Sequence, residues 1–170
     1  LERYLNSFGK QVVAQAKEEL QKEKGDTALS GSIRYELTKE FTAKFFMASY
    51  GKFLDKGVSG TEQKRSFTNQ DGQKEKSPFK YTTKQPPTGI IDKWVVRKGL
   101  KGSRDKEGRF IKRKSMVFLI ARSIKRKGIK GLSFFQKPFG FAMKDFDVLF
   151  GKALKKDIEE AWSKVEAKLN

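Results

Sequence analysis

Positive charge is concentrated in one short segment of this chain. Residues 97–130 hold fourteen Lys or Arg and two acids, a net charge of +12 out of +18 for the 170 residues. Because ionised side chains are almost never buried without a partner, the charged side chains of this segment must stay on the surface of whatever fold forms. A charge of this size attracts polyanions or an acidic protein surface, so we expect a large, negatively charged partner.

The candidate patch consists of eleven cations between residues 97 and 126. Of the 38 cations in the chain, 29 are Lys and nine are Arg. Arg is the side chain that forks onto base edges, so sequence-specific reading of bases is disfavoured. Three interpretations stay open, namely contact with nucleic-acid phosphates, docking on an acidic protein and a solvated surface. The patch residues are Arg97, Lys98, Lys101, Arg104, Arg109, Lys112, Arg113, Lys114, Arg122, Lys125 and Arg126.

The chain has no Cys and no His, which removes the side chains of most known active sites. Disulfides, Cys/His zinc sites, thiol nucleophiles and Ser-His-Asp triads are excluded. The acids are scattered, and no glycine-rich phosphate loop occurs in a strand-to-helix setting. We therefore expect no catalytic residue, no metal, no cofactor and no enzyme, with a metal-dependent nuclease as the remaining catalytic alternative. The longest apolar run, Met116–Ala121, is far shorter than the roughly 20 residues of a membrane span, so we expect no membrane partner.

Apolar periodicity predicts a helix and a strand pair in the first part of the chain. Steps of three and four residues predict a helix over about 2–24 that ends at Gly25. After a turn-rich stretch, 25–31, alternation predicts two strands, 33–37 and 41–45, which form a hairpin.

The second half of the chain reads as helical. Thr88 can cap a helix that ends near Gly99, and Ser115 can cap a helix that ends at Gly128. The run Met116–Ala121 is apolar nearly all round, so we expect this second helix to be covered on more than one side. In addition, Arg122, Lys125 and Arg126 share the face on which Phe118 lies one turn earlier, and Phe110 and Phe118 are the aromatic residues placed beside cations.

A long C-terminal helix is predicted to start between Phe141 and Lys144. Ile158 and Trp162 lie in the middle of its apolar stripe, and we expect both side chains to be buried.

Residues 59–87 form a polar stretch longer than the roughly 12–15 residues of an ordinary loop. Asp71-Gly72 is a hairpin-turn pair with Phe67 on one side and Phe79 and Tyr81 on the other, which favours a β-arm; the alternative is a flexible linker.

The predicted fold is α+β, a single domain over 1–170. It combines the N-terminal helix, a small antiparallel sheet with this arm or loop, and packing helices that include the long C-terminal one.

The order of several short motifs resembles the small tail-completion and neck proteins of tailed bacteriophages. The motifs are Ser30-Gly31-Ser32-Ile33 at a strand start, Tyr50-Gly51-Lys52-Phe53-Leu54-Asp55-Lys56-Gly57-Val58-Ser59-Gly60, Ile120-Ala121-Arg122-Ser123-Ile124 with Gly128-Ile129-Lys130, and Phe134-Phe135-Gln136-Lys137-Pro138 before the last helix. The resemblance covers about residues 28–165, while the long 59–87 segment and the basic connector depart from the family's shorter members.

The resemblance implies a virion structural protein without enzymatic activity, located at the head–tail junction (neck, tail completion or tail terminator) or the proximal tail and assembled in the host cytoplasm. The expected partners are further copies in a closed ring, expected to be six-fold, neighbouring neck and tail proteins, and DNA passing through the channel without sequence specificity. The expected subunit interface comprises Tyr50, Phe53, Leu54, Gly57, Phe67, Phe79, Tyr81 and Phe118. The alternative function is a non-specific nucleic-acid-binding module, which explains the charge but not the arm.

Overall fold

The computed structural model describes residues 1–25, 27–100, 102, 104 and 106–169, and the fold is α+β as predicted. Contacts divide the chain into two compact units. The first unit comprises residues 1–51, 68–73 and 132–170, and the second comprises 52–67 and 74–131. The single-domain prediction concerns folding behaviour, which this division does not test, so it stays a prediction.

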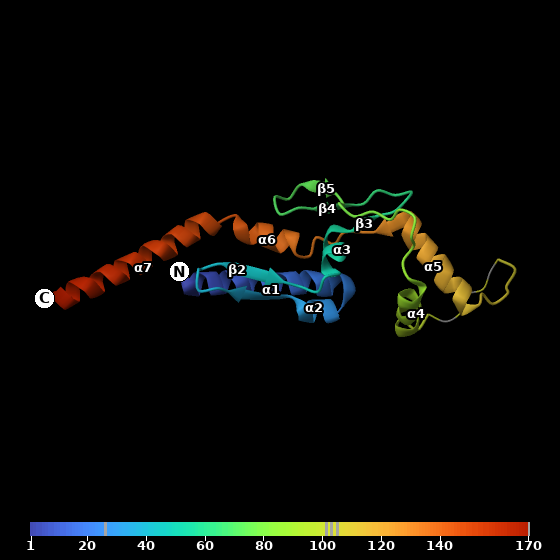
Figure 1. The fold of residues 1–170 in the computed structure, drawn as a ribbon, viewed down its shortest axis with the longest axis horizontal. Helices are drawn as coiled ribbons and strands as arrows, with labels where there is room; N and C mark the ends of the chain where they lie inside the picture. Colours follow the sequence, from blue (N-terminus) through green and yellow to red (C-terminus); the bar gives the residue numbers. More distant parts are fainter. Residues whose placement is uncertain (26, 101, 103, 105, 170) are drawn as a thin grey trace. The chain divides into compact units, whose positions relative to one another are not determined.

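The first unit is built on α1 (Glu2–Lys24), which lies along a β-hairpin of β1 (Arg34–Leu37) and β2 (Ala43–Phe46) (Figure 1). Both predictions are confirmed, because α1 ends at Gly25 and the two strands pair antiparallel, Tyr35 opposite Phe45. The turn-rich stretch contains a short helix, α2 (Ala28–Ser32), that the pattern did not predict. A capping box explains it, since Thr27 and Ser30 each accept a hydrogen bond from the backbone amide of the other.

An aromatic cluster holds the first unit together. The Phe8 ring on α1 lies 6.3 Å from Phe45 on β2, 6.4 Å from Phe139 and 5.0 Å from Phe146, measured between ring centroids. Phe139 lies on α6 (Gln136–Met143), and Phe146 begins α7 (Phe146–Leu169). All three ring pairs have the edge-on geometry that aromatic side chains prefer. Because the rings come from four elements, the cluster joins the hairpin and both C-terminal helices to α1.

The second unit contains α4 (Thr88–Arg97) and α5 (Arg113–Lys127), which pack through Ile91, Val95, Val117 and Ala121. Both helices start differently from the prediction. Thr88 is the first helical residue and not the cap, and α5 begins two residues before Ser115. The residues before these helices, Pro87 and Lys112, make no side-chain capping bond. The predicted cap residues were wrong because a hydroxyl side chain is only one of several groups that can satisfy the free amides at the start of a helix.

The C-terminal end of α5 is joined to the chain after α3 (Gly51–Lys56) by a very close approach of two backbones. β3 (Val58–Ser59) pairs antiparallel with β6 (Gly128–Ile129). A Cβ atom on Gly60 would lie 2.0 Å from the Arg126 carbonyl oxygen, and one on Gly128 would lie 2.1 Å from that of Val58. Gly128 also has φ +73° and ψ −170°, a conformation that only glycine adopts readily.

The polar segment forms the predicted β-hairpin, because β4 (Ser66–Thr68) pairs with β5 (Lys74–Lys76) around Asp71 and Gly72. Gly72 has φ +81°, as the turn requires. The hairpin tip, residues 68–73, belongs to the first unit, where the Thr68 amide donates to Ser133 Oγ at 2.7 Å.

The C-terminal region differs from the prediction in two ways. It consists of two helices, α6 and α7, instead of one helix starting between Phe141 and Lys144. Ile158 and Trp162 are exposed, with 59% and 66% of their surfaces accessible, so the prediction that they are buried is wrong for the single chain. Phe146 at the start of α7 packs on Tyr4 and Phe8 of α1, whereas no described residue encloses the stripe around Ile158 and Trp162.

We predict that Gly128→Ala lowers the free energy of unfolding by at least about 1–3 kcal/mol, because alanine at this backbone conformation is strained and its Cβ meets the Val58 oxygen. Urea denaturation measures the loss. Gly89→Ala is the matched control in the same unit, since a Cβ there meets nothing within 4 Å. Equal midpoints for wild type and Gly128→Ala would contradict the close approach of β3 and β6.

A second prediction compares the stability lost when an exposed and a buried aromatic side chain are truncated. Trp162→Ala should change the free energy of unfolding of the isolated chain by less than about 1 kcal/mol, because its side chain is largely exposed. Phe134→Ala, at a site only 1% exposed, should cost about 3–5 kcal/mol. The comparison is made at low protein concentration, and similar losses for the two variants would mean that α7 packs inside the folded chain.

Candidate functional site

The two units carry very different charges. The second unit holds 23 of the 38 cations and 6 of the 20 acids, a net charge of +17, whereas the first unit holds 15 cations and 14 acids, a net charge of +1. Nearly all of the chain's excess charge therefore belongs to the unit built around α4 and α5. A polyanion would be attracted to this unit and not to the other.

An open hollow lies at the C-terminal end of α5, within the second unit. Phe118, Arg122, Lys125 and Arg126 line it from α5, which confirms that these four side chains share a face. Thr61, Glu62 and Gln85 complete the lining. The hollow thus combines three cations, one aromatic ring and polar groups, an arrangement that can hold an anionic group beside an apolar surface.

The segment 61–63 is placed there by hydrogen bonds to the last turn of α5. The Thr61 amide donates to the Lys125 carbonyl at 3.0 Å, and the Glu62 and Gln63 amides donate to the Arg126 carbonyl at 3.0 and 3.3 Å. Carbonyls at the end of a helix lack partners within the helix, so these bonds satisfy groups that would otherwise need water. The glycine at position 60 permits the approach and thereby brings Glu62 to the hollow.

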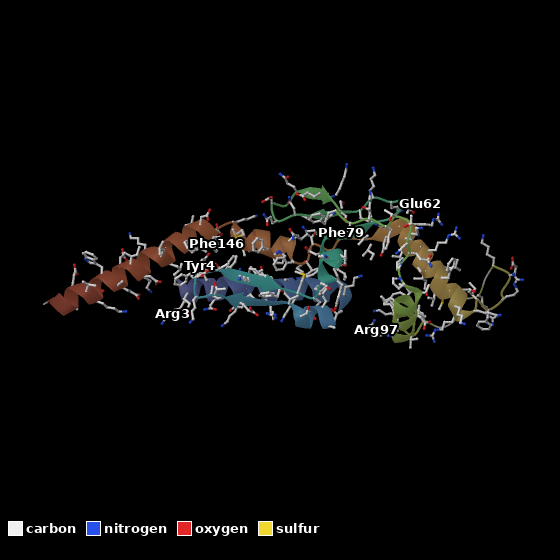
Figure 2. The ribbon with its side chains drawn as sticks, viewed as in Figure 1. Arg3, Tyr4, Glu62, Phe79, Arg97 and Phe146 are labelled. Carbon is white, nitrogen blue, oxygen red and sulfur yellow. The ribbon has the colours of Figure 1, made fainter. Side chains whose placement is uncertain are left out.

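Glu62 is the acid that offsets part of the positive charge of the hollow. Its Oε1 atom lies 2.5 Å from Arg126 Nε (Figure 2 labels Glu62). The hydrogen bond from Arg126, together with the positive charges of Arg122 and Lys127, lowers the pKa of the Glu62 carboxyl below its ordinary value. The pair therefore persists to a lower pH than a carboxyl of ordinary pKa would allow, and it is lost as the pH falls through the lowered pKa.

The predicted patch does not form one cluster. Arg113 and Lys114 begin α5, about 20 Å along the helix axis from Arg126. Arg113 donates two hydrogen bonds to the Asp92 carboxylate, both 2.6 Å long, and these raise the pKa of the Arg113 guanidinium. The α5 cations therefore fall into two groups, one at each end of the helix.

The remaining described residues of the patch are exposed. Arg97 and Lys98 end α4, and Lys112 precedes α5. Arg104 lies over the Phe110 ring, with the guanidinium carbon 4.2 Å from the ring centroid, and Arg109 pairs with Glu107. Phe110 is exposed beside a cation as predicted. Lys101 lies outside the described residues.

The residues expected at a subunit interface have mixed environments. Tyr50, Phe53 and Phe118 are at least one-third exposed, while Leu54, Phe79 and Tyr81 are partly buried. Phe53 and Phe79 pack edge to face with their ring centroids 4.7 Å apart. Gly57 and Phe67 are buried, and Phe67 belongs to the core of its unit. No partner chain tests these assignments, which stay predictions.

The sequence reasoning missed Thr61, Glu62 and Gln85, which come from the polar segment and have no motif. It also missed the exposure of α7, where Leu154, Ile158, Trp162 and Val165 are accessible. Apolar periodicity identified this stripe correctly but could not say what covers it. The exposed stripe is a second candidate surface, of a different chemical kind from the basic hollow.

No group of three or more acids that could hold a metal ion occurs among the residues that the structure describes. Within that same part of the chain, no helix has the combination of length and apolar content needed to cross a bilayer. Comparisons with protein-family models, curated proteins and solved structures found no match to the chain.

Removal of the Glu62 carboxylate should strengthen anion binding at the hollow. In Glu62→Gln the Arg126 guanidinium loses its charged partner, so we expect the affinity for a short DNA duplex to rise a few-fold at low salt, measured by fluorescence anisotropy. Glu40→Gln makes the same charge change on the exposed surface of the first unit and should have a smaller effect. Equal gains for the two variants would show that only net charge matters.

Proposed function

We propose that this chain is a structural protein of a tailed-phage virion, a subunit of a ring at the head–tail junction in the neck, tail-completion or tail-terminator position. The observation that carries the proposal is the apolar surface left exposed on helices of both units. In the second unit, Ile90, Trp94 and Val96 on α4 and Phe118 and Leu119 on α5 are all exposed. In the first unit, α7 exposes the stripe around Ile158 and Trp162.

Exposed apolar faces of this extent are a feature of subunits. Single exposed apolar residues are normal on a monomer, but several on one helix face mark a contact surface. A ring needs two different faces on each subunit, because a head-to-tail contact joins unlike surfaces. Two units of net charge +1 and +17 supply unlike surfaces on one chain. The order of motifs described above supports the placement in a phage neck.

Assembly can be tested with the purified chain by mass photometry and negative-stain electron microscopy. We expect closed rings, with six-fold symmetry, at micromolar concentration. Ile90→Ser combined with Leu119→Ser should abolish them, because both side chains are more than half exposed and contribute apolar area to a contact. An unchanged melting temperature serves as the control for folding. A chain that stays monomeric over a wide range of concentrations would contradict the proposal.

A second candidate function, phosphate binding without sequence specificity, is favoured by the cations of α5. Arg113 and Arg126 already have carboxylate partners, whereas no ion pair with Lys114 or Arg122 occurs among the described residues. Lys114 and Arg122 are exposed, so both can replace the counterions of a nucleic-acid backbone.

The two kinds of cation should behave differently in salt titrations of DNA binding. Each phosphate contact contributes roughly 0.9 to the slope of log affinity against log salt. Lys114→Gln combined with Arg122→Gln should lower the slope by about 2, and Arg113→Gln combined with Arg126→Gln by less, since the latter cations are already paired. Electrophoretic shifts with two unrelated sequences measure both slope and specificity. A double Lys114/Arg122 variant that binds DNA as wild type does would refute the phosphate contact.

A further inference from the structure

We infer that the exposed face of α7 binds the same face of a second copy of this chain, in an antiparallel helix pair centred between Glu160 and Ala161. The inference goes beyond the ring, since it concerns a two-fold contact that forms whether or not rings do. It starts from the unpartnered apolar stripe, in which Leu154, Ile158, Trp162 and Val165 recur at steps of four and three residues. At about 100° per residue these four side chains lie on one side of the helix.

Four of the charges beside the stripe form two pairs that are symmetric about one point of the helix. With Ile158 as reference, Lys155 and Glu166 lie about 60° and 80° to one side, and Asp157 and Lys164 lie about 100° and 120° to the other. Lys155 and Glu166 are equally far along the helix from the point between residues 160 and 161, and so are Asp157 and Lys164. Each cation of these two pairs is therefore matched by an acid on the same flank at the same distance from the centre, whereas Lys152 and Glu159, also within about 120° of Ile158, have no such counterpart.

An antiparallel pair converts this symmetry into contacts. When two copies are related by a two-fold axis through that point, each flank faces the same flank of the partner. Lys155 then lies beside the partner's Glu166, and Asp157 beside the partner's Lys164, and both pairs occur twice. Ile158 lies beside the partner's Trp162, and Leu154 beside the partner's Val165. The apolar pairs are centred within one residue of the centre of the charge pairs, so the apolar stripe and these charges support nearly the same register.

These side chains are available for such contacts. Glu166 is exposed and accepts a hydrogen bond from Trp162 Nε1 at 2.8 Å, and Lys155 is exposed and lies 3.7 Å from Glu159. Asp157 is half exposed and also contacts the amino group of Leu1. The Lys155 and Glu166 contacts are weak pairs on the surface of one helix, so a partner's charge can compete for them.

Two further features favour the antiparallel orientation. The macrodipoles of antiparallel helices oppose each other and attract, whereas those of parallel helices repel. In addition, the N-terminal end of α7 is attached to the first unit through Phe146, which packs on Tyr4 and Phe8 (Figure 2 labels Tyr4 and Phe146). In an antiparallel pair these attached ends lie at opposite ends of the contact and do not crowd each other.

The test uses charge reversal in the full chain, read by sedimentation equilibrium. Lys155→Glu and Glu166→Lys should each weaken dimer formation about fivefold or more, because each removes two ion pairs and replaces them with repulsion. The double variant should restore the wild-type affinity, because the exchanged charges again face each other. Lys156→Glu is the matched control, since it makes the same change on the opposite side of the helix and should leave the affinity unchanged.

Other partners on the exposed face of α7 would give other patterns of affinity among these variants. A parallel pair places residue 155 near the partner's Asp157, so the double variant would be weaker than either single one. Docking on the basic second unit of another copy would be strengthened by Lys155→Glu and weakened by Glu166→Lys. Either pattern would overturn the inference, as would affinities that none of the variants changes. Circular dichroism confirms that each variant keeps its helix.

Cross-linking provides an independent measurement, because the chain contains no cysteine. Leu154→Cys and Val165→Cys should each give little cross-linked dimer with a short bis-maleimide, whereas their mixture should cross-link efficiently. Efficient linking of each variant to itself would indicate a parallel pair and refute the antiparallel one. Ile158→Ser with Trp162→Ser should abolish the two-fold contact, whereas Ile90→Ser with Leu119→Ser should abolish rings and leave the two-fold contact intact, so that failure of this inference and failure of the ring proposal are distinguishable.

Discussion

The close approach of two backbones at the end of α5 is the constraint on which the second unit depends. Glycine at positions 60 and 128 lets β3 and β6 pair at a distance that any Cβ atom would prevent. The same approach supplies amide donors to the last carbonyls of α5, and it brings Glu62 within hydrogen-bond distance of Arg126. The shape and charge balance of the hollow therefore follow from two residues that carry no side chain.

Charge is distributed between the units in a way that gives each a different capacity for binding. Lys125, Arg126 and Lys127 occupy the last turn of α5, where the helix dipole is negative, so the fold itself stabilises part of the basic cluster. The paired cations Arg113 and Arg126 are held by acids of the same unit, while others remain exposed. A polyanion and an acidic protein surface would both be attracted to this unit. Binding of the polyanion would depend mainly on the salt concentration, whereas binding of the protein would depend more on shape complementarity.

The C-terminal helix shows what apolar periodicity predicts about a helix and what it does not. Its apolar stripe is regular, yet its ring contacts with α1 are made at the start, by Phe146 against Tyr4 and Phe8. Farther along, Asp157 contacts the amino group of Leu1, while the stripe itself stays accessible. Periodicity identifies the face that prefers to leave water but not the molecule that covers it. The α1 stripe and the α7 stripe read alike in the sequence, although Val12 and Leu20 are fully buried and Trp162 is not.

Local sequence patterns determined α1 and its end at Gly25, the β1–β2 hairpin, the hairpin turn at Asp71-Gly72, the end of α5 at Gly128 and the shared face of Phe118, Arg122, Lys125 and Arg126. All of these depend on residues close together in the chain, where spacing and backbone preference suffice. Tertiary structure alone decided that Glu62 joins the hollow, that Phe67 lies in the core and that Trp162 does not. Each of these outcomes depends on contacts between segments far apart in the sequence, and burial is a property of the whole packed chain that no local pattern encodes.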